Sequence, residues 1–189
     1  MTIINSLLHI FDDMTNMQIA GNIICFAGAV IMILVGFIKS QERIIAVQCA
    51  QFGLMGIGNL IIGGISGFIS NLVSIIRNLI VFKTKKLSIA LKIFFIALQG
   101  VLTAFFDFGN PYALLPFLAT VIFTIFLDTK DARILKLAII AGEILWVFYD
   151  LHNRNYASFI MDLITIISNI TGLIAVQRMM KKGRNKESV

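Results

Sequence analysis

Charged residues are scarce in this chain, and so are prolines, cysteines and histidines. Asp, Glu, Lys and Arg make up 14% of the 189 residues, against roughly a quarter in an ordinary soluble domain, while 58% are hydrophobic. The two cysteines, Cys25 and Cys49, lie within apolar stretches, which argues against a disulfide framework and against a metal-ligand motif. A soluble core could not bury this much apolar surface, so the composition indicates a membrane protein.

Sequence motifs of enzymes are also missing. The chain contains no HExxH, no GxSxG, no Cys/His cluster and no nucleotide-binding loop, so we expect neither catalysis nor a cofactor. The net charge of +6 does not indicate a nucleic-acid partner, because the basic residues form short clusters between apolar blocks without interleaved aromatics. We interpret these clusters as topology signals.

Seven apolar blocks divide the sequence, each of roughly the 17–25 residues that a helix needs to cross a bilayer. They lie at 18–38, 44–62, 65–82, 87–106, 112–127, 134–149 and 156–176. The connections are short, which predicts that consecutive helices are antiparallel neighbours. The predicted fold class is therefore an all-α membrane protein with seven transmembrane helices.

Basic residues are concentrated on one side of this predicted topology. Fourteen of the 16 Lys and Arg residues fall there. They are Lys39, Arg43, Lys83, Lys85, Lys86, Lys92, Lys130, Arg133, Lys136, Arg178, Lys181, Lys182, Arg184 and Lys186. Since cytoplasmic loops are enriched in Lys and Arg, we expect the N-terminus outside and the C-terminus in the cytoplasm of a bacterial inner membrane.

An internal repeat relates the two ends of the chain. Displaced by 91 residues, 65–79 (ISGFISNLVSIIRNL) aligns without a gap with 156–170 (YASFIMDLITIISNI), with six identical positions. Polar positions match as well as apolar ones, since Asn71 aligns with Asp162 and Ser74 with Thr165. We predict two three-helix repeats that run in the same sense, an arrangement typical of transporters with a mid-membrane site.

The repeat predicts five segments along the chain. Residues 1–17 have helical apolar spacing and no Lys or Arg, which predicts a helix in the membrane surface and argues against a signal peptide. The first repeat (18–82), a linker helix (83–106), the second repeat (107–180) and a basic tail (181–189) follow. The tail is predicted to contact anionic lipid headgroups.

Small and polar residues after the second span carry a family resemblance. They are Gly63-Gly64-Ile65-Ser66-Gly67, Asn71, Ser74, Arg77-Asn78 and Lys83-Thr84-Lys85. This stretch resembles the YgjV-type family of small bacterial inner-membrane proteins, and the likeness extends from about Glu42 to the tail but is weak in the sixth span. The three-plus-one-plus-three plan is also similar to that of SWEET sugar facilitators and PnuC nicotinamide riboside transporters, although the Pro-Gln pair of the PQ-loop relatives is absent. The resemblance implies a fold and brings no activity with it.

Polar residues within the predicted spans form two matching stripes. Asn71, Ser74 and Asn78 share one face of the third span, and Asp162, Thr165 and Asn169 repeat that spacing on the seventh. If the halves pack about a pseudo-two-fold axis, the stripes come together. We predict a hydrogen-bonding cavity for a polar metabolite, and the alternative is interhelical contacts worth roughly 1 kcal/mol per bond.

Three further residues in the spans are candidates. Glu143 and Trp146 share a face of the sixth span, where they could bind a cation, stack a planar ring or take up a proton. The alternative is that Glu143 neutralises a buried cation such as Arg77. Arg77 lies near Lys83, so its side chain can extend to the membrane interface, and a gating or anion-facing role is the alternative.

These features predict a facilitator or secondary transporter of a small polar or aromatic metabolite, such as a vitamin, nucleoside or sugar. Transport would occur by alternating access between the two halves. The alternative function is a non-transporting scaffold or regulatory subunit of a partner protein. The expected partners are the substrate and the lipid bilayer, with self-association into a homo-oligomer left open.

Overall fold

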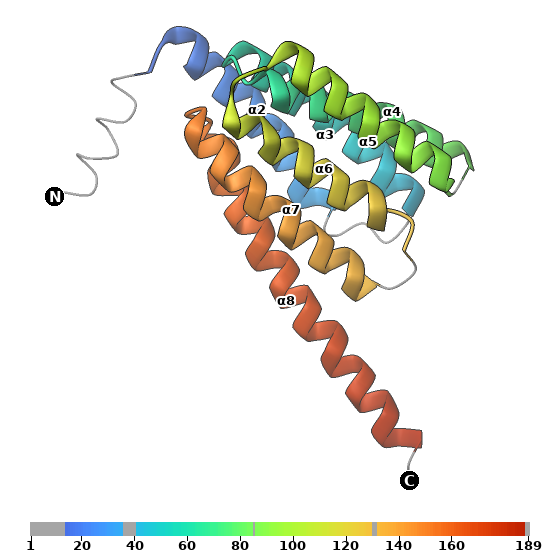
Figure 1. The fold of residues 1–189 in the computed structure, drawn as a ribbon. Coiled ribbons are helices and arrows are strands. Elements are labelled where there is room, and N and C mark those ends of the chain that lie inside the picture. Colours follow the sequence, from blue (N-terminus) through green and yellow to red (C-terminus); the bar gives the residue numbers. More distant parts are fainter. Residues whose placement is uncertain (1–13, 36–40, 85, 130–131, 188–189) are drawn as a thin grey trace, which may run out of the picture.

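The computed structural model describes residues 14–35, 41–84, 86–129 and 132–187, and in these ranges the chain forms seven α-helices, one 3₁₀ turn and no strand (Figure 1). The elements are α2 (Asn16–Val35), α3 (Gln41–Ile61), α4 (Ile65–Thr84), α5 (Ile89–Phe106), η1 (Pro111–Ala113), α6 (Leu114–Phe126), α7 (Ala132–His152) and α8 (Tyr156–Glu187). The prediction of an all-α chain with seven helices is confirmed.

Three helices are long and apolar enough to cross a membrane by themselves. These are α4, α5 and the part of α8 at Tyr156–Ile174. Among the described residues, α2, α3 and α6 contain shorter apolar stretches, at Asn16–Ile31, Ile45–Ile61 and Pro111–Phe126. The composition of these helices therefore supports a membrane location.

Two helices continue beyond the predicted spans. The sixth span was expected to end at about Tyr149, and α7 continues to His152, which puts Asp150 inside the helix. The seventh was expected to end at about residue 176, which agrees with the apolar stretch at Tyr156–Ile174, and α8 itself continues to Glu187. At a rise of about 1.5 Å per residue, the 32 residues of α8 extend about 48 Å, more than the ~30 Å hydrocarbon core, and the helix projects beyond the bundle (Figure 1).

The same turn ends α3 and α7. After α3, Gly63 adopts a φ of +86°, and the amide of Gly64 donates to the carbonyl of Asn59 at 2.8 Å. After α7, Arg154 adopts a φ of +56°, and the amide of Asn155 donates to the carbonyl of Asp150 at 2.9 Å. Both are Schellman motifs, in which a left-handed residue lets the next amide reach back to the last helical turn. They lie 91 residues apart, the same displacement that aligns the sequence.

Six helices pack in a closed ring. Going round it, α2 contacts α3, α3 contacts α4, α4 contacts α6, α6 contacts α7, α7 contacts α8, and α8 returns to α2. The last contact joins the two ends of the described chain. The remaining helix, α5, packs on α4 and α6 and is not needed to close the ring.

Glycines allow α2 and α3 to approach closely. A Cβ at Gly21 would lie 2.9 Å from the carbonyl oxygen of Gly58, and a Cβ at Gly58 would lie 2.8 Å from the carbonyl oxygen of Gly21 and also meet Cys25. Small residues at such a crossing let two backbones pack directly. This pair is therefore a fixed contact within the first three helices.

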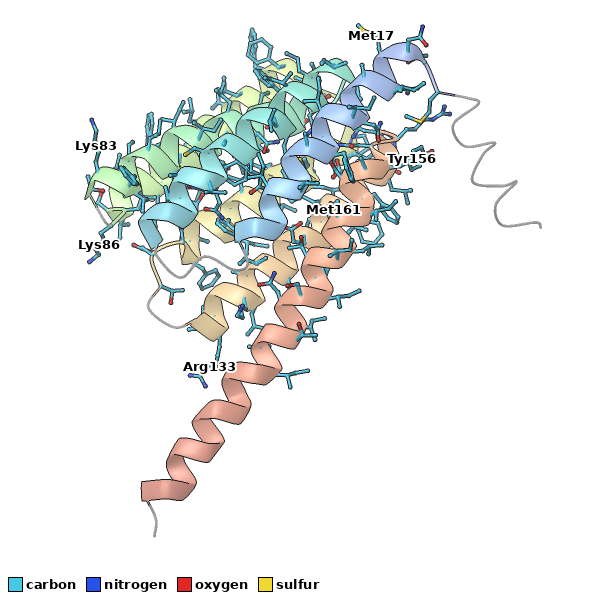
Figure 2. All side chains as sticks on the ribbon, turned by 180° about the vertical axis from the view of Figure 1, so that it is seen from behind. Met17, Lys83, Lys86, Arg133, Tyr156 and Met161 are labelled. Carbon is cyan, nitrogen blue, oxygen red and sulfur yellow. The ribbon has the colours of Figure 1, made fainter. Side chains whose placement is uncertain are left out.

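Basic residues mark one end of the bundle. Lys83, Lys86 and Arg133 lie at the end opposite to Met17 and Tyr156 (Figure 2). The predicted surface helix at 1–17 falls mostly outside the described residues, as do the side chains of the basic tail. Following the predicted orientation, the end of the bundle near Met17 and Tyr156 is called the outer end, and the end near Lys83 the inner end.

Candidate functional site

Polar side chains fill much of the space between the helices. Among the described residues, about as many polar as apolar side chains are buried, while large apolar residues face outward, with Phe105 78% and Ile89 77% exposed. This inverts the pattern of a soluble protein, because lipid rather than water surrounds the bundle. The polar interior is where a functional site must be sought.

Arg77 anchors a polar network between α3, α4 and α6. It is 1% exposed, and its Nη1 donates to Thr124 Oγ1 at 2.8 Å. Its Nε and Nη2 lie 3.4 Å from Asn78 Oδ1, and Asn78 Nδ2 donates to Gln48 Oε1 at 3.3 Å. The guanidinium carbon also lies 5.5 Å from the centre of the Phe123 ring. These contacts hold a buried cation between the first three helices and α6.

A second polar contact joins α5 to its neighbours. Gln99 is fully buried, and its Nε2 donates to Ser70 Oγ at 2.5 Å and lies 3.4 Å from the carbonyl oxygen of Pro116. The outer neighbour of Gln99 on α5 is Thr103, which is also buried. In the part of the chain that the structure describes, each of these side chains has an oxygen without a hydrogen-bond partner, Gln99 Oε1 and Thr103 Oγ1.

At the outer end, α4 contacts α7 through its backbone. The amide of Gly67 donates to the Tyr149 hydroxyl at 2.8 Å. A Cβ at Gly67 would lie 2.8 Å from Tyr149 Cε1 and 2.9 Å from Asn59 Cγ, so only glycine fits there without a shift. Nearby, the amide and hydroxyl of Ser66 both donate to Asp107 Oδ2. The start of α4 is therefore held by residues that follow it by 41 or more positions.

The start of α8 is held in a comparable way by α2. Asn22 Nδ2 donates to the carbonyl of Arg154 at 3.1 Å, and Asn22 Oδ1 accepts from the amide of Ala157 at 3.0 Å. Ser66 and Ala157, the residues whose amides are bound in the two places, are again 91 positions apart. Both contacts lie where a helix begins, at the outer end.

Three carboxyl groups form a chain between α7 and α8, which we call the carboxyl triad (Glu143, Asp162 and Asp150). Asp162 lies beside Glu143 on one side and beside Asp150 on the other, with its carboxyl group within hydrogen-bonding reach of both. Asp150 is fully buried, Asp162 is 3% exposed, and Glu143 is partly buried. Asn155 Nδ2 donates to Asp150 Oδ1 at 3.2 Å, which ties the triad to the α7–α8 turn.

Several buried polar atoms have no partner among the described residues. They are Asn59 Nδ2, Asn59 Oδ1, Gln99 Oε1, Thr103 Oγ1, Asp150 Oδ2 and Asp162 Oδ2. Unsatisfied buried groups are few in native proteins, and each calls for a reason such as a bound water, ion or ligand. Asn59 stands out because it is fully buried and both atoms of its amide are unpaired.

A family model described as bacterial inner membrane protein, Imp-YgjV, matches residues 19–180. The chain belongs to this family. No curated protein and no solved structure matches it. The expectation of a bacterial inner-membrane protein is thereby confirmed, and the apolar helices agree with it.

In this Imp-YgjV family member, the predicted stripe on α4 is buried. Asn71, Ser74, Arg77 and Asn78 all face the bundle interior. Asn71 Nδ2 donates to the carbonyl oxygen of Gly67, one turn earlier in the same helix, at 2.8 Å. The side-chain oxygen of Asn71 takes no part in this bond. Asn78 reaches α3 through Gln48, as described above.

The predicted stripe on α8 is only partly buried. Asp162 is enclosed, whereas Thr165 and Asn169 are half-buried, and Asn169 Nδ2 donates to the carbonyl of Thr165 in its own helix at 2.9 Å. The neighbours of α8 are α7 and α2, while those of α4 are α3, α5 and α6. Helix packing therefore does not bring the two stripes into contact, and they lie on different sides of the ring.

Two interpretations of charged residues are corrected by these contacts. Arg77 does not extend to the membrane interface, because Thr124 and Asn78 hold its guanidinium inside the bundle. Glu143 pairs with Asp162 rather than with Arg77. Trp146 lies beside Tyr149 in an edge-to-face arrangement, with ring centroids 5.5 Å apart. On α7, Trp146 is one helical turn from Glu143 and one turn from Asp150.

Sequence reasoning missed Asp150, Asn59, Tyr149 and Asn22. Asp150 was assigned to a connection because it follows an apolar block and precedes a polar turn. The 91-residue repeat held a usable signal, since it aligns Asp150 with Asn59 just as it aligns Asp162 with Asn71. Among the described residues, no group of three His, Cys, Asp or Glu side chains is arranged to hold a metal ion.

Proposed function

We propose that this family member is a transporter that moves a small polar or aromatic metabolite through the six-helix ring. The main support is the polar interior of that ring, where buried side chains on α3, α7 and α8 have hydrogen-bonding atoms without a partner among the described residues. A membrane protein that served only as a scaffold would gain nothing from such groups, since each one costs free energy when buried without a partner.

The two halves of the transporter would be parallel three-helix repeats, α2–α4 and α6–α8, with α5 as the linker. Support comes from the 91-residue displacement, which relates the sequence stripes, the two Schellman turns and the two helix-start contacts. The order of helices in the ring is compatible with a two-fold axis, because advancing each helix by one half reproduces the same neighbours. Parallel repeats of this kind place a substrate between the halves.

We infer that the substrate is held by Asn71, Ser74 and Asn78 from the first half, and by Glu143, Trp146, Asp162, Thr165 and Asn169 from the second. Amides and hydroxyls suit a ligand with several hydroxyl or amide groups, and Trp146 suits a planar ring. Arg77 would fix α4 against α6 through Thr124, which makes it a positioning residue between the halves.

Alternating access would begin from a state closed at the outer end. There, Gly67 with Tyr149 joins α4 to α7, and Asn22 joins α2 to the start of α8. Both contacts cross between the proposed halves. Opening the outer end then requires these few hydrogen bonds to break, while the glycine contact within α2 and α3 stays intact.

Uptake into proteoliposomes tests this proposal. A panel of labelled sugars, nucleosides and vitamins would be screened with the purified full-length protein. For the compound transported, Asp162→Asn and Asn78→Ala should abolish uptake while leaving expression and thermal unfolding unchanged. The matched controls are Asp128→Asn in the α6–α7 connection and Asn16→Ala at the exposed start of α2, which remove the same groups away from the polar interior and should keep uptake.

Thiol accessibility separates transport from the scaffold alternative without a substrate. In a background with Cys25 and Cys49 replaced by alanine, Ser74→Cys and Thr165→Cys would be exposed to a membrane-impermeant thiosulfonate. Transport requires that water reach both positions, so both should react. Protection of both, together with no uptake across the panel, would favour a scaffold or regulatory subunit.

A further inference from the structure

The carboxyl triad has a chemical requirement that other hydrogen-bonded groups in the bundle do not share. An ionised carboxylate only accepts hydrogen bonds, so a bond between two carboxyl groups needs a proton on one of them. The Asp162 carboxyl is within reach of Glu143 and of Asp150. A hydrogen bond on each side would need two protons, which would leave at most one negative charge on the three carboxyl groups.

The buried oxygens agree with this count. If all three groups were ionised, Asp150 Oδ2 and Asp162 Oδ2 would be enclosed in the bundle with no donor, as no N–H or O–H of another described residue reaches them. A proton shared between the two carboxyl groups supplies each oxygen with a partner. The same proton removes the repulsion of adjacent charges in a low-dielectric interior.

The repeat indicates that the fold does not need carboxyl groups here. Displaced by 91 residues, Asp150 corresponds to Asn59 and Asp162 to Asn71, while Glu143 corresponds to Phe52. The first half thus builds the same turn with amides, which cannot take up or release a proton at physiological pH. The acids add one property to the second half, namely exchangeable protons.

Other side chains around the triad come from α2, α3, α7, α8 and the α7–α8 turn. On α2, Cys25 lies near Asn155 Nδ2 at 3.4 Å, and on α7, Tyr149 adjoins Asp150. On α8, Ser158 Oγ is near Met55 Sδ of α3 at 3.9 Å. In the turn, the Arg154 side chain is exposed. The described contacts of the triad are with the Asn155 amide group and between its own members.

The triad also has a direction. Glu143 and Asp150 are seven residues apart on α7, which separates them by about 10 Å along the helix, with Asp162 between them. Asp150 lies two residues from the end of α7, at the outer end, and Glu143 lies near the middle of that helix. The three carboxyl groups therefore extend from the outer end toward the middle of α7.

We propose that the carboxyl triad is the proton-binding site of this transporter and couples uptake to the proton gradient. A proton from outside forms an O–H bond with the Asp150 carboxylate, and successive transfers through Asp162 to Glu143 form one O–H bond as each previous one breaks. Release from Glu143 to water on the inner side returns the triad to its starting charge. The coupling rests on the proposed transport function, but proton binding itself does not.

Proton binding can be measured without any substrate. Infrared spectra of the full-length protein in lipid nanodiscs would be recorded across a pH series, and the C=O stretching band of protonated carboxyl groups followed. The single tryptophan of the chain, Trp146, lies one turn from both Glu143 and Asp150, so its fluorescence should follow the same titration. We expect the band and the fluorescence transition to change together.

Variants assign the signal. Asp162→Asn removes the central carboxyl and should abolish the coupled transition, and Asp128→Asn, a carboxyl outside the triad, should leave it unchanged. Should Asp162→Asn fail to fold, Glu143→Gln and Asp150→Asn each retain one carboxyl pair and should each remove part of the band. An unchanged band in all folded triad variants would overturn the proposal.

Failure of coupling and failure of transport give different results. Uptake that persists without a pH gradient, and that survives Glu143→Gln, would refute coupling but leave the transporter intact. Uptake that follows an imposed sodium gradient instead would also refute it. If the infrared transition is present but no compound is taken up, the triad binds protons and the proposed transport function is the part that fails.

Discussion

Gly67 brings the backbone of α4 within reach of an aromatic side chain on α7. Its amide binds the Tyr149 hydroxyl, and its missing side chain leaves room for the Tyr149 ring and for Asn59. A single hydrogen atom in place of a methyl group thus determines whether α4 and α7 can pack this closely. This kind of contact depends on backbone approach and tolerates little added volume.

We expect Gly67→Ala to lower the unfolding free energy by about 1–3 kcal/mol, because the new methyl group overlaps Tyr149 and Asn59. Thermal unfolding in detergent, followed by circular dichroism, measures the effect. Gly53→Ala is the matched control, since nothing lies within 4 Å of a Cβ at that position of α3. The control should be neutral or slightly stabilising, as alanine favours a helix over glycine. Equal effects of the two substitutions would contradict the packing argument.

Arg77 depends on a hydroxyl of another helix. Thr124 accepts from its Nη1 and itself donates to the carbonyl of Thr120. Thr124→Val keeps the shape but removes both bonds, so we expect a loss of about 1–3 kcal/mol, the usual cost of leaving a buried group unpaired. Chemical denaturation of the variant measures it, with Thr171→Val on α8, where the hydroxyl is exposed, as control. A Thr124→Val protein as stable as the parent would show that Arg77 finds another partner.

At the scale of elements, one ion pair ties α5 to the connection after α6. Lys92 Nζ lies 2.5 Å from Asp128 Oδ1 and donates to the carbonyl of Ile125 at 2.8 Å. Partial burial alone would raise the pKa of Asp128, but the hydrogen bond and the positive charge of Lys92 outweigh it and hold this pKa below its ordinary value. The pair therefore stabilises the position of α5 whenever Asp128 is ionised.

The sign of the pH dependence follows from that direction. Because folding lowers the pKa of Asp128, the stabilisation is complete above the ordinary aspartate value of about 3.9 and is lost as the pH falls below it. We expect Asp128→Asn to lower stability at pH 7 by less than about 1 kcal/mol, as is typical of pairs near the surface. Unfolding measured at pH 7 and at acidic pH should show this difference shrinking. A difference that grows on acidification would contradict the assignment.

The ends of individual helices were easier to predict from the sequence than the contacts between helices. The start of α4 and the end of α5 coincide with the predicted span ends, because a glycine turn and an aspartate interrupt the apolar runs there. Burial of Asn71, Ser74 and Asn78 followed from helical spacing. The contact between α2 and α8 could not be predicted, since it depends on Asn22 reaching a turn 132 residues away. Asp150 was assigned to a connection because a polar turn follows it. In the structure that turn binds the backbone carbonyl of Asp150 through the amide of Asn155, so Asp150 remains within α7.

For the whole molecule, the distribution of basic residues predicts the orientation in the membrane. Lys83, Lys86 and Arg133 lie at one end of the bundle, opposite to Met17 and Tyr156 (Figure 2). With this end in the cytoplasm, a green fluorescent protein fused after Val189 should fluoresce, and an alkaline phosphatase fused there should be inactive. Fusions within the 107–110 connection should give the reverse result. Phosphatase activity at the C-terminus would invert the topology and with it the direction proposed for the triad.

The position of α5 outside the ring has a consequence for how such a chain can arise. If the halves are parallel repeats as proposed, two separate three-helix subunits could form the same ring as a homodimer without a linker helix, provided that both inserted with the same orientation. Joining them into one polypeptide is a different matter, because a unit of three crossings ends on the opposite side from where it started. One additional crossing returns the chain to the side from which the second unit must begin. A single linker helix such as α5 is therefore the smallest addition that can join the two units in one chain.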